Sequence, residues 1–591
     1  MIYKSGDPKL PQNYRPIAII PLLYKLMSRL LCNRLEATFD TQQSPDQAGF
    51  RRGFSTDDHL FTTAMLHEQS HCWQLPLWAA AIDFKKAFDC VDHKHLWDAL
   101  RQQHIPEAYI TLLQHMYNDQ TATVRTDTSS RSFSIQRGVK QGDPLSSFLF
   151  NALLEHIFRQ IKPGWQRKKF GIKLGFAQET SITNLRFADD VLLYAPNLRQ
   201  LTCLLRDLKS KASCCGLSLH PDKTKILTNV SRRAGRTITH IVLDGARIDI
   251  LPNDQSTKYL GRKLSFHDFH GHELNNRIAA GWSKFHQLRC ELTNKKLPLH
   301  SRLRLFSGTI TPCVMYGCSS WTLTKDMLIT LQRTQRKMLR LIINTPRRRN
   351  TLEASRQTAR AGCNTNNGTR VDVNDTESST DTRTDNSTGR RRQQHQHQHR
   401  PQHQHQHQHR TPHQHLHHQP KTASKPTIAP APTTTPALTA APAPTPTPAP
   451  TTATDGDNDD GSESWVHFIR RSTSTALAHA KRARVDDWTD VYFKRKWTFA
   501  ARVANHDHDR WTRLSASWDP CTHDPRPAIR RHGGQKKLWH DDIVSYLHDV
   551  ADTGNDSKWW VLAQNLPWWK TREEGFLDYM RSFLHSGNYN E

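Results

Sequence analysis

Residues 346–464 cannot form a hydrophobic core, and they divide this 591-residue chain into two parts that can. The segment runs from a polar stretch through a His-Gln tract and an Ala-Pro-Thr tract into a short acidic run. A segment of this composition buries almost no apolar surface, and its prolines favour an extended backbone. We therefore predict a disordered linker between two folded regions. The alternating His-Gln tract is more typical of repeat expansion than of a metal site.

The positive charge of the chain is concentrated after its first third. Lys plus Arg number 82 against 55 Asp plus Glu, and +18 of the net charge of +27 falls within residues 201–350. Such a concentration indicates a surface that follows the phosphates of nucleic acid, although a solvated helical face is the alternative. No stretch approaches the roughly 18 apolar residues of a membrane helix. The 11 scattered cysteines are typical of a reducing compartment, so we expect an intracellular protein, in nucleus or cytoplasm.

Apolar periodicity predicts two helices in the first part of the chain. Leucines and Met27 recur at intervals of three and four between residues 22 and 35, which predicts an amphipathic helix. A second apolar period follows Asp143-Pro144 and extends to residue 161. We expect Asp143 to be the N-cap of that helix and Pro144 its first residue.

Three aspartates fall at the ends of short apolar segments that read as buried strands. Asp83 follows the run 76–82, and Asp189-Asp190 lie at the turn of a predicted hairpin over 184–195. Carboxylates in apolar surroundings are costly unless a cation compensates them. Hard oxygen ligands with open positions suit two Mg²⁺ ions in an in-line phosphoryl transfer. An isolated Asp-Asp pair is more often an ordinary turn, so this interpretation depends on the motifs around it.

Seven motifs between residues 13 and 261 resemble, in order, those of reverse transcriptases of non-LTR (LINE-type) retrotransposons. Three of them, at 83–89, 137–146 and 187–190, are similar to the palm motifs of that family. The other four are similar to its fingers, late palm and primer-grip motifs, and they lie at 13–17, 47–51, 216–225 and 259–261. Each motif is weak alone, but the ordered set is specific.

The resemblance implies an α+β fold of the right-hand polymerase type, with an antiparallel palm sheet and a helical thumb. Fingers and palm would span 1–265 and the thumb 266–345. The disordered linker 346–464 would then lead to a small, Trp-rich and mostly helical C-terminal domain over 465–591. The implied activity is RNA-directed DNA polymerisation, with Mg²⁺ as cofactor and an RNA template, a DNA primer and dNTPs as partners. Protein partners are not indicated.

The resemblance also assigns roles at the catalytic centre. Asp83 and Asp189 would bind both Mg²⁺ ions with support from Asp190, and the backbone carbonyl of Phe84 would complete the site. Phe88 would be the steric gate that excludes a 2′-OH.

Further residues are implied as contacts of the incoming nucleotide. Gln141 and Gly142 would pack against the nucleotide and the template base. Either Lys223 or Lys225 would lie near the leaving pyrophosphate, and the sequence does not choose between them. Arg15, and Arg51 or Arg52, are candidates for the triphosphate, since a guanidinium fork suits phosphate oxygens; a surface charge is the alternative for each.

The thumb and the end of the palm would hold the template–primer duplex. Tyr259 and Gly261 fall in the segment that resembles the primer grip. Four basic residues at helical spacings would form one face of a thumb helix: Arg333, Arg336, Lys337 and Arg340. An A-form hybrid is held mainly through its backbone, so we expect little sequence reading.

Some features depart from the family pattern. The first residues resemble sequence that normally lies inside a longer protein of this family, so we expect a truncated copy. The alternative function is that of an inactive remnant that only binds nucleic acid. A group II intron maturase is disfavoured because the linker follows the thumb directly. Residues 539–542 (WHDD) contain an acid pair that would suit a nuclease, although a helix N-terminus explains it equally well.

Overall fold

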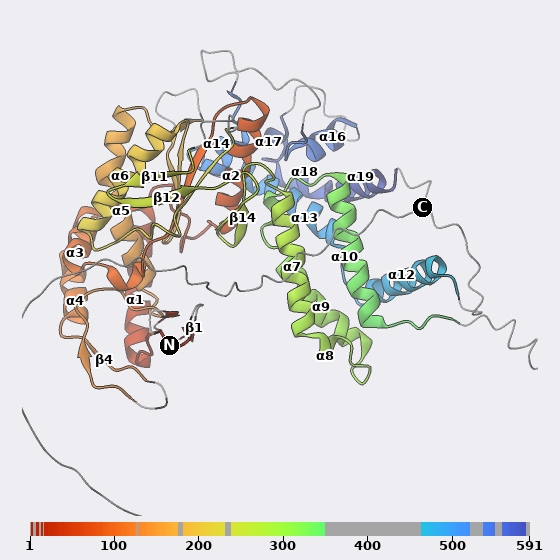
Figure 1. Cartoon of the computed structure of the whole chain (residues 1–591), viewed down its shortest axis with the longest axis horizontal. Coiled ribbons are helices and arrows are strands. Elements are labelled where there is room, and N and C mark those ends of the chain that lie inside the picture. Colours follow the sequence, from red (N-terminus) through yellow and green to blue (C-terminus); the bar gives the residue numbers. More distant parts are fainter. Residues whose placement is uncertain are drawn as a thin grey trace, which may run out of the picture. The chain divides into compact units, whose positions relative to one another are not determined.

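The structure is a computed structural model, and it describes most of the chain outside the predicted linker. The described residues are 2–3, 7–10, 13–15, 17–125, 127, 129–174, 181–230, 238–348, 463–520, 536–549 and 558–586. Nearly all of the 346–464 prediction therefore lies outside the described residues. Residues 1–347 and 465–591 belong to one compact unit, and the following description concerns that unit (Figure 1).

A six-stranded sheet forms the centre of the first part of the chain. Its strand order is β11-β12-β10-β3-β9-β8. The bounds are β3 (Trp78–Ile82), β8 (Asn184–Phe187), β9 (Asp190–Ala195), β10 (Lys225–Thr228), β11 (His240–Leu243) and β12 (Ala246–Ile250). Neighbouring strands are antiparallel except β10 and β12, which are parallel. The expected antiparallel palm sheet is thus present, with one parallel pair near its edge.

The two faces of the sheet belong to different hydrophobic clusters because side chains alternate along each strand. Ala80 and Ile82 of β3 pack in one cluster with apolar residues of α5 (Ser146–Arg167) and α6 (Leu198–Cys214). Ala79 and Ala81 pack in the other, which contains α2 (Thr56–Cys72). All four of these β3 side chains are buried. Helices on both faces therefore fix the strand ends where the aspartates lie.

The predicted helix over 22–35 is confirmed as α1 (Leu22–Gln42), but its apolar stripe is only partly used. Leu31 and Leu35 are buried, whereas Leu22 and Leu23 are 82% and 79% exposed. Periodicity predicts which side chains share a face, not what packs on it. The predicted start of α5 is wrong by a few residues. Asp143 and Pro144 lie in a turn before the helix, because the amide of Ser146 donates to the carbonyl of Asp143.

Smaller elements complete this part of the chain. The helices are α3 (His93–Gln102), α4 (Glu107–Tyr117) and the 3₁₀ turn η2 (Ala87–Cys90). Four two-stranded ribbons pair β1 (Ile2–Tyr3) with β2 (Tyr14–Arg15), β4 (Thr121–Ala122) with β5 (Phe133–Ser134), β6 (Ile172–Lys173) with β7 (Ser181–Ile182), and β13 (Thr257–Tyr259) with β14 (Arg262–Leu264).

The expected thumb region is helical. Its elements are α7 (Gly271–Gln287), α8 (Arg289–Leu292), α9 (Leu299–Val314), η3 (Cys318–Ser320) and α10 (Lys325–Ile343). Helices α7, α9 and α10 pack against one another (Figure 1). The buried residues of α10 include Leu328, Leu331 and Met338, which recur at helical spacing and hold it against its neighbours.

Residues 465–586 are helical wherever they are described as regular structure. The helices are α12 (Trp465–Arg482), α13 (Trp488–Ala504), α14 (Trp511–Ala516), α16 (Asp541–Asp549), α17 (Trp559–Leu562), α18 (Leu566–Thr571) and α19 (Glu573–His585). Trp497 and Trp569 stack with ring centroids 3.9 Å apart, and each indole N–H donates to the other's carbonyl. Among the described helices, none has the length and apolarity needed to cross a membrane.

Candidate active site

The three predicted aspartates lie at one end of the central sheet. Strands β3 and β9 pair with Ile82 opposite Val191, and the same register continued by one residue sets Asp83 opposite Asp190. Strand β8 pairs with β9 through Phe187 and Asp190, so Ala188 and Asp189 form the hairpin turn. Residues opposite each other in an antiparallel pair are close neighbours. The fold therefore brings Asp83 to the Asp189-Asp190 pair, which lies more than one hundred residues later in the sequence.

The hairpin turn is held from outside by the predicted fingers motif at 47–51. The side-chain oxygen Oε1 of Gln47 accepts hydrogen bonds from the amides of Gly49 and Ala188, both at 2.9 Å. A Cβ at Gly49 would lie 2.4 Å from the amide nitrogen of Ala188, so this backbone approach requires glycine. Ala188 itself has a positive φ of 54°. The sequence motif thus has a structural purpose, which is to fix the turn that carries Asp189.

The sequence left Lys223 and Lys225 as alternative contacts of the leaving pyrophosphate, and their surroundings in the structure differ. The Nζ of Lys223 lies 3.5 Å from Oδ2 of Asp83, and its side chain is 52% exposed. The Nζ of Lys225 lies 2.8 Å from Oδ2 of Asp249. Lys223 therefore reaches Asp83, and Lys225 belongs to an ion pair on β10 and β12.

The donor chemistry of this site fits a divalent cation that substrate oxygens help to hold. Within the described ranges, no three His, Cys, Asp or Glu side chains are gathered closely enough to hold a metal ion unaided. The side chain of Asp83 is 39% exposed, and its neighbour is the ammonium of Lys223. Exposed carboxylates with open positions suit Mg²⁺, which keeps few protein ligands and takes substrate phosphates. Phe84, whose carbonyl is the implied further ligand, bridges to Leu219 beside Asp83.

Two further motifs meet next to Asp83. The amide of Val139 donates to the carbonyl of Phe88 at 2.7 Å, and the Nε2 of Gln141 donates to Oδ1 of Asp89 at 3.1 Å. The ring of Phe88 stacks on Phe150 with centroids 4.6 Å apart. These bonds join the 83–89 and 137–146 segments into one wall.

Gly142 lies on the open side of this wall. It is exposed and has a φ of 109°, a conformation that favours glycine. The carbonyl of the preceding Gln141 accepts from the amide of Ala18 at 2.9 Å. The chain near Ala18 is therefore part of the same surface as the predicted nucleotide contacts.

The predicted triphosphate arginines have different surroundings. The guanidinium of Arg51 is 10% exposed and donates to Oδ1 of Asp40 and to two backbone carbonyls of the 44–47 loop. Arg52 is 85% exposed and pairs with Glu36 at 2.7 Å. Arg15 lies in β2, opposite Ile2. Arg51 thus holds the fingers loop together, and Arg52 is the one with an accessible guanidinium.

The predicted primer-grip segment forms the hairpin of β13 and β14. Tyr259 is buried, and its pKa lies well above the ordinary value because of burial, with Tyr194 and Asp190 contributing. The hydroxyl of Tyr316 donates to the carbonyl of Leu260 at 2.9 Å, and Gly261 is exposed at the tip. The hairpin is therefore anchored to the thumb region through Tyr316.

The four basic residues of α10 lie on one face of the helix, but they differ in solvent exposure. Arg333 and Lys337 are exposed, whereas Arg336 and Arg340 are half-buried. The Nη1 of Arg340 donates to Oγ1 of Thr473 on α12 at 2.8 Å, and burial lowers its pKa. The C-terminal helix α12 therefore takes up part of the face that the sequence assigned to a duplex.

A buried charge cluster beneath the turn was not predicted. Its members are Asp46, Glu155, Lys162 and Arg186. Oδ2 of Asp46 lies 2.6 Å from Lys162 and 3.4 Å from Arg186, whose other partner is Glu155 at 2.8 Å. Burial alone would raise the pKa of Asp46, but Lys162 and Arg186 outweigh it and hold that pKa well below the ordinary range. No local pattern marks these residues, because their partners are distant in sequence.

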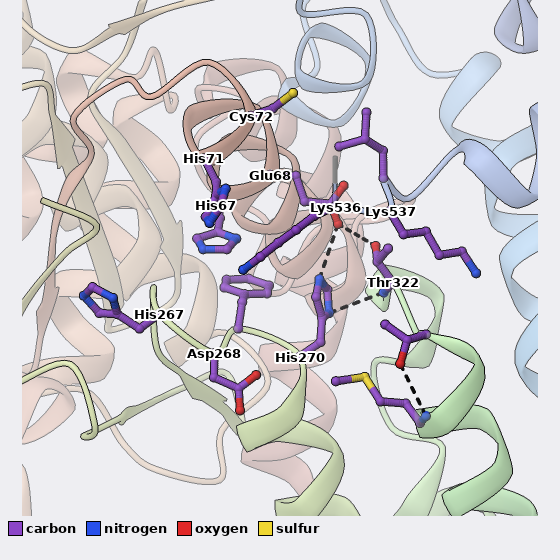
Figure 2. A pocket seen from close by; sticks show the side chains of 14 residues that line it. His67, Glu68, His71, Cys72, His267, Asp268, His270, Thr322, Lys536 and Lys537 are labelled. Atoms are coloured by element: carbon purple, nitrogen blue, oxygen red, sulfur yellow. Dashed lines mark hydrogen bonds and ion pairs between the residues drawn. The ribbon is translucent and has the colours of Figure 1, made fainter. Parts of the chain in front are cut away.

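A cavity of about 440 Å³ lies where α2, the loop after β14, the start of α10 and residues 536–538 meet (Figure 2). Its most buried acid is Glu68, which accepts from the Thr322 hydroxyl and, at 2.9 Å, from the amide of Trp539. Nε2 of His270 lies 3.3 Å from the same carboxylate, and burial lowers the pKa of His270. Figure 2 shows Glu68 and His270 pointing toward one another. This carboxylate joins the palm, the thumb region and the C-terminal segment.

The acid pair at 541–542 has structural partners. Asp542 is buried between Lys496 at 2.6 Å and Lys537 at 2.5 Å. Oδ2 of Asp541 accepts from the amide of Leu538 at 2.7 Å, at the start of α16. The geometry agrees with the helix N-terminus interpretation.

Three carboxylates gather at one end of the sheet beside Lys223, an arrangement that suits metal-assisted phosphoryl transfer and so indicates a nucleotidyltransferase. Known proteins give the same assignment. The family model for reverse transcriptase (RNA-dependent DNA polymerase) matches residues 2–264. The Pol polyprotein of the type-1 retrotransposable element R2 of Popillia japonica is 30% identical over 362 residues, which cover 58% of this chain and 48% of that protein.

Two relatives from Drosophila melanogaster agree. The Pol polyprotein of retrotransposable element R2DM is 32% identical over 224 residues, covering 38% of this chain and 20% of that protein. The probable RNA-directed DNA polymerase from transposon BS is 28% identical over 362 residues, covering 58% and 38%. Residues 2–264 thus match the reverse transcriptase family, and over the aligned segments the chain is similar to polymerases of non-LTR retrotransposons.

The chain spans about half, or less, of the length of these relatives. Among solved structures, apo telomerase from Candida tropicalis aligns with a TM-score of 0.32 and 15% identity, covering 54% of this chain and 52% of that chain.

Proposed function

We propose that this chain is an active RNA-directed DNA polymerase, which adds dNTPs to the 3′-OH of a DNA primer paired to an RNA template. The observation that carries the proposal is the placement of Asp83, Asp189 and Asp190 at one sheet end, with the ammonium of Lys223 at 3.5 Å from Asp83. A turn that only ended a hairpin would not need carboxylates from two strands and a bracing glutamine.

The carboxylates of Asp83 and Asp189 would hold two Mg²⁺ ions, with Asp190 and the carbonyl of Phe84 in support. When bound, these ions would stabilise the charge on the attacking and leaving oxygens. Lys223 would lie at the leaving pyrophosphate, where its ammonium neutralises charge and donates a proton. We assign this role to Lys223 rather than Lys225, because Asp249 already pairs with Lys225.

The wall formed by segments 83–89 and 137–146 would select the nucleotide. The stack on Phe150 fixes the ring of Phe88, and a fixed ring beside the sugar would exclude a 2′-OH. Gly142 would let the backbone approach the base pair, since it presents no side chain. Arg52, the exposed member of its pair, would meet the triphosphate.

The thumb region would hold the RNA–DNA hybrid through its phosphates. Arg333 and Lys337 are exposed on α10, and the +18 charge of residues 201–350 would attract the duplex. The 259–261 hairpin would lie against the primer strand near its 3′ end.

Primer extension tests this function. The full chain is mixed with an RNA template, an annealed DNA primer, dNTPs and Mg²⁺, beside Asp189→Asn, which keeps the shape but removes the charge. We expect extension by the unmodified chain and a loss of at least about 100-fold in the variant. Hybrid binding without extension by either protein would instead support a nucleic-acid-binding remnant. Equal extension by both would refute the assigned acids.

A further inference from the structure

The C-terminal part of the chain is bonded to the loop that fixes the catalytic turn. The indole Nε1 of Trp511, on α14, donates to Oδ1 of Asp46 at 2.8 Å, although the two residues are 465 positions apart. Trp511 is 9% exposed and Asp46 is fully buried. The acceptor carboxylate therefore lies out of bulk water, and the indole is nearly so.

Three consecutive residues lead from that bond to the catalytic turn. The carbonyl of Asp46 accepts from the amide of Arg186 at 2.7 Å, and the amide of Ala48 donates to the carbonyl of Arg186 at 2.9 Å. Between them, Oε1 of Gln47 accepts from the amide of Ala188. A displacement of the 46–48 loop would thus move both Arg186 and Ala188, which lie three positions and one position before Asp189.

The two carboxylate oxygens of Asp46 have separate donors. Oδ2 faces Lys162 and Arg186, and Oδ1 takes the indole N–H of Trp511. A buried carboxylate oxygen that loses its donor pays a desolvation penalty, which favours a shift of the loop toward another donor. Trp511 is therefore placed to influence the position of the loop as well as its stability.

Neighbouring contacts show that this part of the C-terminal segment is firmly seated. Arg502 donates to Oδ2 of Asp58 at 2.8 Å, and Arg502 and Arg510 both donate to the carbonyl of Gly53. The guanidinium of Arg510 also lies 3.7 Å from the ring centre of Phe54. Helix α14 packs along α2, the helix that follows this loop.

We propose that Trp511 is a positioning residue of the polymerase site, which acts through Asp46 and Gln47 on the turn that carries Asp189. The C-terminal segment beyond the linker is then part of the catalytic apparatus. The kinetic consequence of this inference rests on the proposed polymerase function, but its structural consequence does not.

The test compares Trp511→Phe with Trp488→Phe in the full chain. Trp488 is a matched control, because it is fully buried and its indole donates to Oγ1 of Thr311 at 2.9 Å, away from the turn. Hydrogen exchange of the peptide over 184–191 reports on the Ala188 amide without any need for activity. We expect exchange of this peptide to be about ten-fold faster in Trp511→Phe than in the unmodified chain. In Trp488→Phe we expect the exchange rate to be unchanged. Unchanged exchange in Trp511→Phe would overturn the inference.

Steady-state primer extension adds the kinetic readout. For Trp511→Phe we expect kcat to fall about ten-fold while KM for dNTP stays within two-fold, because the turn shifts and the nucleotide wall does not. A kcat equal to that of Trp488→Phe would contradict the positioning role. If the unmodified chain extends no primer, the proposed function fails, and the exchange experiment still decides the inference.

Discussion

Oε1 of Gln47 and the amide nitrogen of Ala188 are 2.9 Å apart, across 141 positions of sequence. This hydrogen bond joins the 47–51 segment to the turn that carries the proposed catalytic residue Asp189. Together with the close approach of the backbone at Gly49, it explains why a glutamine and a glycine occupy positions 47 and 49. The turn is therefore held by a side chain from elsewhere, not only by its own hairpin.

Gly49→Ala is expected to reduce activity, because the added Cβ displaces the turn that carries Asp189. A Cβ at this position would lie 2.4 Å from the Ala188 nitrogen, so the turn must move. We expect kcat for primer extension to fall at least about ten-fold, since small misplacements at a reacting centre are costly. Gly164→Ala is the control, because a Cβ there meets nothing within 4 Å. Equal turnover in the two variants would show that the turn is not rigidly held.

Lys223→Ala and Lys225→Ala should differ sharply. Lys223 lies 3.5 Å from Asp83, whereas Lys225 pairs with Asp249, which Arg247 also contacts at 2.9 Å. Single-turnover incorporation should fall about 100-fold in Lys223→Ala and remain within about two-fold in Lys225→Ala. The reverse order would mean that the β10 lysine serves the pyrophosphate.

Removing the exposed charges of α10 should weaken hybrid binding through electrostatics alone. For the double variant Arg333→Gln, Lys337→Gln, the slope of log affinity against log salt should decrease by up to about two, since each phosphate contact releases about one counterion. Arg340→Gln is the matched comparison, because its guanidinium bonds Thr473. Arg340→Gln should lower the melting temperature and leave the salt slope nearly unchanged. An unchanged slope in the double variant would exclude α10 from the duplex surface.

Acid should destabilise the folded unit through buried histidines. Burial lowers the pKa of His59 and of His67 to about 3, against an ordinary value of 6.5. Above pH 6.5 both states are neutral and stability is unaffected. Between pH 6.5 and 3 only the unfolded chain binds the proton, so each histidine costs about 1.4 kcal/mol per pH unit.

Urea unfolding at pH 7, 6 and 5 measures this dependence. His59→Leu should flatten it by the contribution of one histidine, because the ring, packed 6.5 Å from Phe187 between centroids, no longer titrates. An identical pH dependence in the variant would show that His59 is protonated in the folded chain.

The sequence alone was sufficient to predict single helices and hairpins, because neighbouring residues determine them. The hairpin around Asp189 and the α10 helix over 325–343 follow from alternation and period, and both are confirmed. Partners distant in the sequence were beyond such reasoning. Arg51 reads as a phosphate ligand until its bond to Asp40 is seen, and nothing near Trp511 points to Asp46. The exposure of the leucines at the start of α1 was unpredictable for the same reason. Periodicity shows that these side chains share one face of the helix, but it does not show whether another element packs on that face.

Template-directed synthesis is the most direct test of the central claim. The full chain is given a DNA primer on RNA templates that differ only in the first unpaired base, with each dNTP supplied singly in Mg²⁺. We predict that only the complementary dNTP is added to each template, and that Asp83→Asn and Asp189→Asn abolish the addition. Addition independent of the template base, or undiminished in both variants, would contradict the account.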